Sequence, residues 1–406
     1  MSTAGRLYER LLQRHFEDHR QMAFLMGPRQ VGKTTTSRIL GKSKARFLYF
    51  NWDNLDEQRV LLQGPGALAA QLGLDRLGEE KPLLVLDEIH KYPRWRELLK
   101  GFFDTYGGQV NIAVTGSARL NVFHASGDSM MGRYFNYRMH PLSVAELASP
   151  RDDVEPGERG PSAIPDDDWG ALLRFGGFPE PYLRRDERFA RRWRRLRHDL
   201  LFREDIRDLT RIQELSRVQL LGQLVAQRAG QLVSYTTFAK EVGVSIETIK
   251  RWLKALEALY YCFPLRPWYR NVSRSLRKEP KYFLWDWSLV DDAGARFENL
   301  VACALLKAVH LWTDLGYGDF ALHFLRDKDK REVDFVVVRD GTPWFLVEAK
   351  VSGRVNLSEP LAYFSDKLGV RGAFQVAERL DYVDRSCWPL ERPTIVPART
   401  FLSQLV

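Results

Sequence analysis

The sequence predicts an α/β protein whose N-terminal part is a parallel β-sheet covered by helices, followed by helical segments and a second α/β module. Three observations lead to this prediction. Short apolar runs alternate with helix-like segments through the first third of the chain, which is typical of such a sheet. A glycine-containing loop at residues 25–40 joins one apolar run to a helix. A later apolar run, residues 83–86, ends in two acidic residues.

Length and composition limit the class of protein. At 406 residues the chain is too long for one hydrophobic core, and roughly one domain per 150 residues predicts two to four domains. The 61 basic and 52 acidic residues give a net charge of +9, which permits a polyanionic partner without requiring one. No apolar run approaches the ~20 residues that cross a bilayer, and the first 20 residues predict a charged amphipathic helix in place of a signal peptide. We therefore expect no membrane partner and a cytoplasmic location.

The loop at residues 25–40, LMGPRQVGKTTTSRIL, has the spacing G-x-x-x-x-G-K-[ST]. In such a loop backbone N–H groups surround a phosphate chain, while Lys33 reaches its outer oxygens and Thr34 places its hydroxyl on Mg²⁺. A strand-to-helix turn with an incidental lysine is the alternative, which the strand-like and helix-like flanks disfavour. The residues predicted to bind the nucleotide are Gly27, Pro28, Arg29, Gln30, Val31, Gly32, Lys33, Thr34 and Thr35.

The second apolar run, LLVLDE at residues 83–88, is typical of a buried parallel strand that carries two acids at its carboxyl end. Asp87 is expected to hold Mg²⁺ through water and Glu88 to polarise the attacking water, since phosphoryl transfer needs both roles near the γ-phosphate. A further β-rich run, VNIAVTGSAR, ends in small polar residues. Ser117, or less readily Thr115, could hydrogen-bond the attacking water or the γ-phosphate, with an ordinary turn at the strand end as the alternative.

Together these residues resemble the AAA+ branch of P-loop ATPases, with residues 27–34 as Walker A, Asp87 and Glu88 as Walker B, and Ser117 as sensor 1. The resemblance covers roughly the first third of the chain. It implies ATP and Mg²⁺ as cofactors, with Lys33, Glu88 and Ser117 among the catalytic residues.

The same resemblance implies an arginine, just before the fifth strand, that reaches into the neighbouring subunit's site. Arg133 occupies that place in MGRYFNYRMHPLSVAEL, and Arg119 competes with it. Function would then depend on a homo-oligomer, for which a hexameric ring is one form, because a trans-acting arginine stabilises charge on the transferring phosphoryl group. An arginine that is merely solvated at a helix end is the alternative.

The strand, helix and loop signals, together with the resemblance, imply four domains: an AAA+ core at 1–145, a helical lid or linker at 146–217, a winged-helix domain at 218–290 and an α/β domain at 291–406. The helical segment looks like the lid of AAA+ proteins. Four of its apolar residues have the spacing of a single helix face: Phe189, Trp193, Leu196 and Leu200. The arginines around that stripe form either a solvated face or a contact with nucleic acid.

Within 218–290, SYTTFAKEVGVSIETIKRWLKALEALYYCFPLRPW predicts two helices separated by a turn at Gly243, with Ser245 as the N-cap of the second. The residues that follow are expected to form a β-hairpin wing. A structural lid or a dimerisation module without nucleic acid is the alternative. The polar face of the second helix carries four residues that suit DNA phosphates better than base edges: Thr248, Lys250, Arg251 and Lys254.

Residues 331–350, REVDFVVVRDGTPWFLVEAK, predict two strands joined by an Asp-Gly turn. Because side chains alternate along a strand, Glu348 and Lys350 share a face, where Asp334 can join them. The pattern resembles the core of PD-(D/E)xK nucleases, in which carboxylates bind Mg²⁺ and a lysine positions the attacking water. Glu298 in ARFENLVACALLKA matches the helix glutamate of that fold. A surface ion-pair network is the alternative.

Over nearly its full length the chain resembles bacterial and archaeal ATPases whose C-terminal domain, of the DUF4143 type, has no assigned function. The resemblance rests on the order of the domains and on the sequence motifs MHPLSVAEL, FGGFPEPYL and EVDFVVV…VEAK. It implies a P-loop NTPase (AAA+) parallel-sheet core, a helical lid, a winged-helix domain and a restriction-endonuclease-like α/β domain.

The predicted function is ATP hydrolysis coupled to remodelling or processing of DNA, including branched DNA such as Holliday junctions. A nucleotide-dependent signalling or defence switch, whose C-terminal domain is a docking module or an effector nuclease, is the alternative. A protein-remodelling ATPase is a further one.

Overall fold

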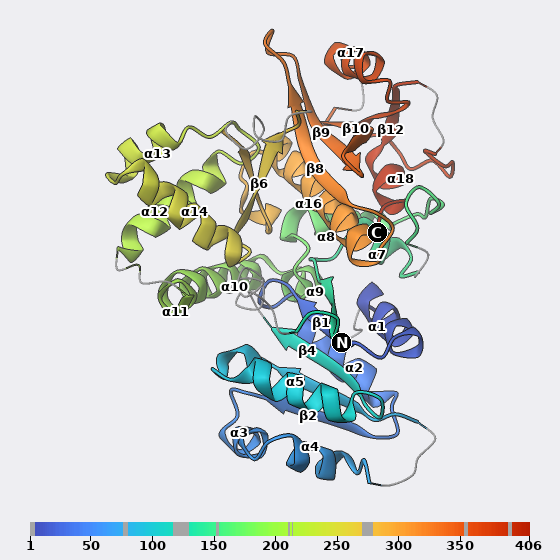
Figure 1. The fold of residues 1–406 in the computed structure, drawn as a ribbon. Helices are drawn as coiled ribbons and strands as arrows, with labels where there is room; N and C mark the ends of the chain where they lie inside the picture. The colour runs from blue at the N-terminus through green and yellow to red at the C-terminus, as the bar shows by residue number, and fades with distance from the viewer. Residues whose placement is uncertain are drawn as a thin grey trace. The chain divides into compact units, whose positions relative to one another are not determined.

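The computed structural model describes residues 5–75, 80–116, 130–151, 154–209, 212, 214–269, 279–352, 356–388 and 392–406. The chain separates into two compact units, Met1–His140 and Pro141–Val406, coloured blue to teal and green to red in Figure 1. Ser117 and Arg119 lie outside the described residues, so their predicted roles rest on the sequence alone.

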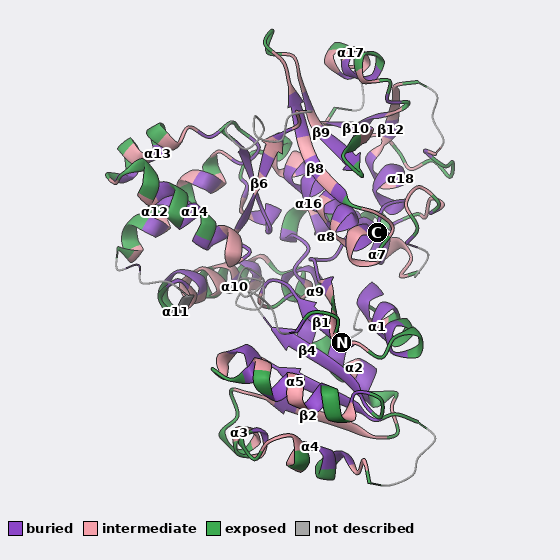
Figure 2. Ribbon diagram, in the orientation of Figure 1, coloured by how far each residue is buried: buried purple, intermediate pink, exposed green. Residues whose placement is uncertain are grey.

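The first unit is built on a five-stranded sheet in the order β2-β3-β4-β1-β5, in which every pair of neighbours is parallel. The strands are β1 (Met22–Met26), β2 (Phe47–Asn51), β3 (Leu83–Asp87), β4 (Asn111–Gly116) and β5 (Tyr134–Arg138). β1, β3 and β4 are buried along their whole length because helices cover both faces of the sheet, and Figure 2 shows β1 and β4 in purple. The predicted parallel-sheet core is confirmed.

The helices of the first unit place the loop that follows β1. They are α1 (Leu7–Asp18), α2 (Lys33–Lys42), α3 (Leu55–Leu62), α4 (Pro65–Leu72), the 3₁₀ turn η1 (Ile89–Lys91) and α5 (Trp95–Tyr106). On one face Phe24, Leu86 and Val114 of the strands pack with Leu99 and Phe102 of α5. α2 packs against β3 and β4, and α1 packs against α2. The loop between β1 and α2 therefore lies at the carboxyl edge of the sheet.

The second unit begins with a series of helices. They are α7 (Val144–Ala148), α8 (Asp166–Phe175), α9 (Pro179–Arg184), α10 (Glu187–Asp199), the π-helical η3 (Leu200–Asp205), α11 (Ile206–Leu209), α12 (Leu215–Gln227), α13 (Tyr235–Val242) and α14 (Ile246–Ala258). The predicted apolar face of α10 is wrong in part, because Trp193 is buried whereas Leu196 is 66% exposed. Arg197 lies 3.7 Å from the centre of the Phe178 ring and pairs with Asp286, so the arginine run is not wholly solvated.

A seven-stranded mixed sheet in the order β12-β11-β10-β9-β8-β6-β7 organises the rest of the second unit. Its strands are β6 (Cys262–Pro267), β7 (Lys281–Leu284), β8 (Phe320–Arg326), β9 (Glu332–Arg339), β10 (Thr342–Lys350), β11 (Gly372–Ala377) and β12 (Thr394–Pro397). The helices among them are the 3₁₀ turn η4 (Trp287–Leu289), α16 (Ala293–Asp314), α17 (Glu359–Leu368) and α18 (Ala398–Ser403).

Two hairpins of this sheet bear on the sequence predictions. β9 and β10 pair antiparallel as predicted, and Asp340 and Gly341 take left-handed conformations in their turn. The β6–β7 hairpin, expected as a wing, joins the same sheet because β6 pairs with β8. The winged-helix interpretation of 218–290 and the domain boundaries stay predictions.

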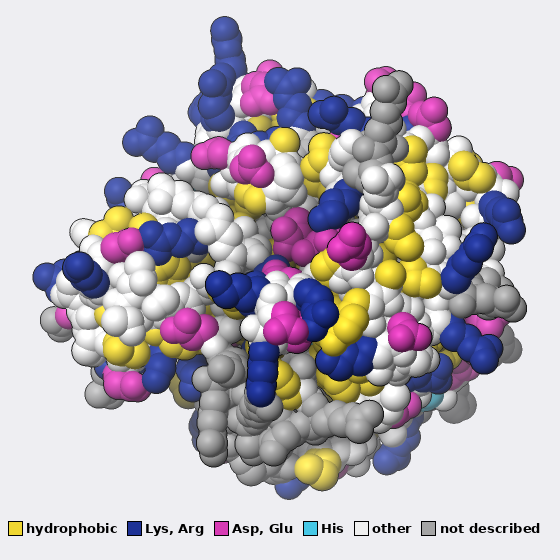
Figure 3. Space-filling model, turned by 90° about the horizontal axis from the view of Figure 1, so that it is seen from above, with side chains coloured by type: hydrophobic (Ala, Val, Ile, Leu, Met, Phe, Trp, Pro, Cys, Tyr) yellow, Lys and Arg dark blue, Asp and Glu magenta, His cyan; other side chains and the backbone are white. Residues whose placement is uncertain are grey.

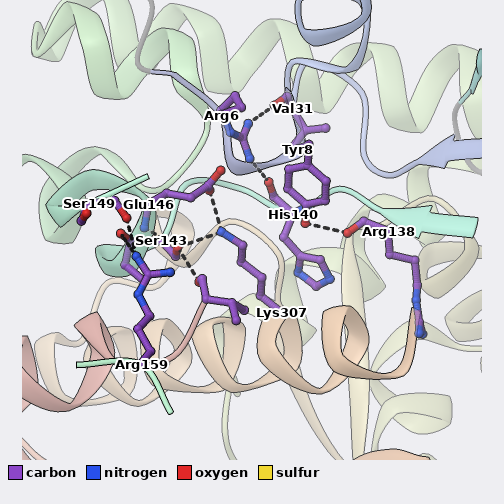
Figure 4. Close-up of polar contacts among 12 residues, drawn as sticks. Arg6, Tyr8, Val31, Arg138, His140, Ser143, Glu146, Ser149, Arg159 and Lys307 are labelled. Atoms are coloured by element: carbon purple, nitrogen blue, oxygen red, sulfur yellow. Dashed lines mark hydrogen bonds and ion pairs between the residues drawn. The ribbon is translucent and has the colours of Figure 1, made fainter. Parts of the chain in front are cut away.

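A buried ion pair ties α7 to α16 within the second unit. The side chains of Lys307 and Glu146 are each 1% exposed, and Nζ lies 2.6 Å from Oε2. Lys307 also donates to Ser143 Oγ at 2.8 Å, and Ser143 donates to the Val406 carbonyl at 2.7 Å. Figure 4 shows the lysine pointing from α16 toward both α7 partners. Loss of either charge would remove this buried ion pair and destabilise the packing of α7 on α16, so the pair is a structural anchor.

At 22 residues α16 is a long helix with many buried apolar side chains. Neither it nor any other helix within the described ranges combines the length and the apolar character needed to span a lipid bilayer.

Candidate functional site

The phosphate loop leaves β1 at the carboxyl edge of the first unit's sheet. Gly27 has a φ of 156°, and a Cβ atom there would lie 2.3 Å from the carbonyl oxygen of Met139, so only glycine allows these backbones to approach. Gly32 takes a left-handed conformation, with a φ of 107°, as the N-cap of α2. Both glycines of the motif thus meet backbone requirements at the start of a helix, where unpaired N–H groups favour an anion.

The side chains of the loop differ in their exposure. Pro28 and Val31 are buried, Arg29 is half-buried, and Gln30 and Thr35 are exposed. The protein itself therefore holds the middle of the loop, whereas Gln30 and Thr35 remain accessible to solvent or a ligand.

Lys33 is the charged centre of the loop. Its side chain is buried, and Nζ donates to the carbonyl oxygens of Gly27 at 2.9 Å and Pro28 at 2.7 Å. Burial lowers the pKa of Lys33 to about 8, while the carboxylates of Glu88 and Asp87 oppose that shift. The amine is thus mostly an ammonium at neutral pH, and it is hydrogen-bonded to carbonyls of its own loop. To bind phosphate oxygens, it would exchange these carbonyls for the phosphate.

Asp87 is held at the end of β3 by three hydroxyl donors. Its Oδ2 accepts from Thr34 Oγ1 at 2.7 Å and from the Tyr49 hydroxyl at 2.6 Å, and its Oδ1 accepts from Thr115. Burial, and then the Asp87 carboxylate, raise the pKa of Tyr49, so the phenol stays a donor. The Thr34 hydroxyl and the Asp87 carboxylate form an adjacent set of hard oxygen atoms, which fits Mg²⁺. Thr115, weighed against Ser117, is therefore engaged in orienting Asp87.

Glu88 follows Asp87 in a left-handed conformation, with a φ of 55°. Its backbone N–H donates to the Thr115 carbonyl at 3.0 Å, which fixes the turn away from β3. Its Oε2 is buried and has no hydrogen-bond partner among the described residues, although His90 Nε2 and Lys91 Nζ lie 3.6 and 3.5 Å away. A buried carboxylate oxygen with spare acceptor capacity beside the loop fits the predicted role of polarising a water.

Arg133 lies at the opposite edge of the sheet. Its carbonyl accepts from the Met22 N–H, and the next residue, Tyr134, is in register with Met22 at the start of β1. Five strand residues at about 3.3 Å each separate this edge from the phosphate loop, so Arg133 cannot act on its own loop. Its guanidinium pairs with Asp104, 2.7 Å from Nε to Oδ1. The predicted role on a neighbouring copy stays a prediction.

The first turn of α1 braces the phosphate loop, as Figure 4 shows. Arg6 is buried, and its Nη1 donates to the Val31 carbonyl at 2.6 Å while its Nη2 donates to the His140 carbonyl at 2.6 Å. The Tyr8 hydroxyl donates to the Arg138 carbonyl at 2.7 Å and accepts from the His140 N–H at 3.1 Å. Sequence reasoning missed Arg6, Tyr8 and Tyr49, because no local pattern shows that they contact the loop or Asp87.

The four predicted nuclease residues are brought together in the second unit. The Asp334 N–H donates to Glu348 Oε2 at 3.4 Å, and Asp334 Oδ2 accepts from the Ala349 N–H at 2.9 Å. Lys350 pairs with Glu348 at 2.7 Å. Burial raises the pKa of Glu348 to about 7 and that of Glu298 to about 8, and the Asp334 charge adds to both shifts. The carboxylates thus lie close enough to repel one another.

Lys281 of β7 belongs to this cluster and was missed by sequence reasoning. Its amine is buried and lies 2.6 Å from Glu332 Oε1 and 3.6 Å from Glu298 Oε1, so an internal ammonium balances part of the acidic charge. Within the described ranges, no group of three or more His, Cys, Asp or Glu side chains has the arrangement of a metal site. The ion pairs of Lys281 and Lys350 occupy part of the cluster, and its nuclease role stays a prediction.

The predicted DNA-contact residues lie along α14. Ser245 caps the helix as expected, since its hydroxyl accepts from the Thr248 N–H at 3.1 Å. Lys250, Arg251 and Lys254 are exposed, and Lys250 pairs with Glu247 of the same helix at 3.0 Å. Figure 3 shows basic side chains scattered over one face of the molecule, with acidic ones among them. α14 thus presents its basic residues to solvent, and their contact with DNA stays a prediction.

Family models match three parts of the chain. Residues 19–148 match a model described as an AAA domain (AAA_14). Residues 166–298 match a domain of unknown function, DUF8612, and residues 293–391 match another, DUF4143. The AAA match supports the predicted ATPase class for the first unit, and the DUF4143 match agrees with the C-terminal resemblance.

Relatives share low identity with the chain over long stretches. An uncharacterised protein of Mycobacterium tuberculosis is 24% identical over 80% of this chain and 69% of its own length. One from Haemophilus influenzae is 22% identical over 91% and 93%. Among solved structures, AMPPCP-bound DnaA from Aquifex aeolicus is 12% identical, covers 63% of this chain and 89% of its own, and gives a TM-score of 0.32. Hsp104 with ATPγS and casein is 14% identical, covers 56% and 53%, and gives 0.29.

Proposed function

We propose that the first unit binds ATP with Mg²⁺ and hydrolyses it. The observation that carries this proposal is the convergence at one sheet edge of the Lys33 ammonium on its loop carbonyls and the Thr34 hydroxyl on Asp87. The AAA-domain match over residues 19–148 supports the same class of activity.

Each residue of the site has a distinct part in this proposal. Lys33 transfers its hydrogen bonds from loop carbonyls to the outer phosphate oxygens, and the backbone of 27–32 surrounds the inner ones. Glu88 accepts a hydrogen bond from the attacking water through its unsatisfied Oε2 and orients that water. Thr34 and Asp87 would hold Mg²⁺, which neutralises charge on the phosphate oxygens. Ser117 is proposed to bind the attacking water as well.

We further propose that Arg133 completes the site of a neighbouring copy, so that the active form is a homo-oligomer such as a hexameric ring. Its position at the sheet edge opposite its own loop supports action in trans. A trans arginine typically contributes on the order of 10³-fold or more in rate.

The work proposed for this ATPase is remodelling or processing of DNA, including branched DNA. Support comes from the net charge of +9 and from the exposed Lys250, Arg251 and Lys254 on α14, with Thr248 beside them. The competing proposal is a nucleotide-dependent switch. Strong stimulation of the ATPase by four-way-junction DNA over duplex and single strands would favour the DNA function, and a slow, DNA-independent ATPase would favour the switch.

A metal-dependent nuclease in the second unit is the second candidate function. The convergence of Glu298, Asp334, Glu348 and Lys350 favours it, whereas the ion pairs of Lys281 count against it. Nicking of supercoiled plasmid with Mg²⁺ or Mn²⁺, measured for wild type and Lys350→Ala, decides between a nuclease site and an ion-pair network. Cleavage that the variant lacks supports the nuclease, and no product from either protein rejects it.

The ATPase proposal is tested by measuring MgATP affinity and steady-state hydrolysis in parallel. We expect Lys33→Ala to lose measurable ATP binding. Glu88→Gln should retain binding and lose about 10²–10⁴-fold in hydrolysis, because it keeps the shape of the side chain but cannot accept a proton. Lys42→Ala, an exposed lysine at the far end of α2, is the matched control. Magnesium-dependent hydrolysis that survives in Lys33→Ala would reject the assignment.

A further inference from the structure

An open groove on the second unit lies between the β8–β9 turn and α17. Its volume is about 650 Å³, enough for one or two nucleotide units. Four aromatic residues, Trp268, Tyr269, Tyr363 and Phe364, line it together with basic and acidic residues of the turn and a lysine of α17. Neither the nucleotide site nor the carboxylate cluster includes these residues.

The aromatic wall of the groove is held rigidly. Trp268 is half-buried and packs on the apolar core beneath the sheet, and its backbone N–H donates to the Phe324 carbonyl at 2.8 Å. The Arg331 guanidinium lies 3.8 Å from the centre of the Tyr363 ring. Partly exposed rings that are fixed by packing suit a stacking platform, because little side-chain entropy is lost on binding.

The charges of the groove fall into two groups. Arg331 pairs with Asp327 at 2.8 Å and with Asp329 at 2.5 Å. All three residues line the groove, and the two carboxylates more than offset the charge of the guanidinium. Lys328 is exposed and has no hydrogen-bond or ion-pair partner among the described residues. Lys367 is exposed and donates to the Tyr363 hydroxyl at 2.8 Å. Two ammonium groups without a carboxylate partner thus border the aromatic wall.

We propose that this groove binds a single-stranded polynucleotide, with bases stacked on Trp268 and backbone phosphates on Lys328 and Lys367. Planar rings beside unpaired ammonium groups match the alternation of base and phosphate along a strand. A duplex offers no free base faces, because its bases stack on each other.

The groove also lies next to the carboxylate cluster. Arg326 lines the groove and pairs with Glu332, which pairs with Lys281 at 2.6 Å. A strand in the groove would thus lie near this cluster. This inference rests on the proposed action on DNA and names the part of the chain that grips one strand.

The test uses the full-length protein without nucleotide and measures fluorescence anisotropy of a labelled 20-nucleotide oligothymidylate. We expect Lys328→Ala with Lys367→Ala to weaken binding and to reduce the slope of log affinity against log salt by about 1.4, since each phosphate contact on a single strand contributes ~0.7. Trp268→Leu should weaken binding about tenfold or more through lost stacking. Lys330→Ala changes an exposed lysine of the same turn outside the groove lining and is the matched control.

Four competitor ligands separate the outcomes. Unlabelled single strand should displace the probe, whereas a duplex of equal length, free AMP and polyglutamate should do so poorly. Equal competition by duplex or polyglutamate, or wild-type affinity and salt slope in the double lysine variant, would overturn the proposal. If the protein binds single strands and the groove variants bind them with wild-type affinity, the groove is not the binding site, but the proposed DNA function is not contradicted. MgATP binding, measured separately, reports on the ATPase alone.

Discussion

The buried guanidinium of Arg6 donates a 2.6 Å hydrogen bond to the backbone carbonyl of Val31, in the middle of the phosphate loop. A second one, also 2.6 Å, reaches the carbonyl of His140, just after β5. One side chain from the N-terminal helix thus ties the loop to the last residues of the first unit. Because both acceptors are backbone atoms, the link depends on the fork of the arginine and not on its charge alone.

We predict that Arg6→Ala weakens MgATP binding by about tenfold or more and lowers the free energy of unfolding of the first unit by about 2–4 kcal/mol, since two carbonyls lose their buried donor. Arg6→Lys can satisfy one carbonyl and should be intermediate. Nucleotide titration and urea unfolding measure the two effects. Arg10→Ala, exposed on the same helix, is the control, and an Arg6→Ala protein with unchanged affinity would contradict the bracing role.

The pKa of Lys33 predicts a pH dependence. Burial lowers it from 10.5 to about 8, so between pH 8 and 10.5 the unfolded chain binds more protons at this site than the folded one. Stability of the ligand-free protein should therefore rise with pH across that window through this group, while MgATP affinity falls as the ammonium is lost. Urea unfolding and ATP titration at pH 7.5, 8.5 and 9.5 measure both trends. Lys33→Met should abolish the rise of the free energy of unfolding with pH. If that variant shows the same rise as wild type, the pH dependence belongs to another group.

Tyr49 is predicted to tune the response to magnesium. Tyr49→Phe removes one of three donors to Asp87 and leaves the ring in place, so the carboxylate becomes less well oriented. We expect the Mg²⁺ concentration for half-maximal hydrolysis to rise about three- to tenfold, a loss of ~1 kcal/mol typical of one hydrogen bond. Magnesium titrations of the ATPase rate measure this concentration. Tyr106→Phe, on α5, should behave as wild type. If Tyr49→Phe needs the same Mg²⁺ concentration as wild type, Tyr49 has no role in orienting Asp87.

The predicted action of Arg133 on a neighbouring copy can be tested by mixing two inactive variants. Arg133→Ala should keep ATP binding and lose turnover by on the order of 10³-fold. Glu88→Gln should be inactive for a different reason, since it lacks the group that orients water. If the two act on one site from different copies, a mixture of the variants recovers part of the activity, because some interfaces pair an intact Glu88 with an intact Arg133. Normal hydrolysis by Arg133→Ala alone would exclude the assignment.

Local pattern was enough to predict much of the first unit. The motif at 27–34 and the pair of acids after 83–86 are each a short continuous stretch of sequence. Each directly follows a predicted strand, one as a glycine-containing loop and the other as two carboxylates. Helix periodicity similarly located α14 and its cap, Ser245. It failed for Leu196, which is 66% exposed, because periodicity shows that a face is apolar but not whether another element covers it.

Sequence alone determined the phosphate-loop spacing, the strand that carries Asp87 and Glu88, and the alternation that puts Glu348 and Lys350 on one face. Only the tertiary structure decided that Arg6 and Tyr49, 25 and 38 positions away from the residues they serve, donate to Val31 and Asp87. It also placed Lys281 among the carboxylates. The physical reason is that hydrogen bonds and ion pairs between distant segments depend on strand order and helix packing, which bring together residues that share no local pattern.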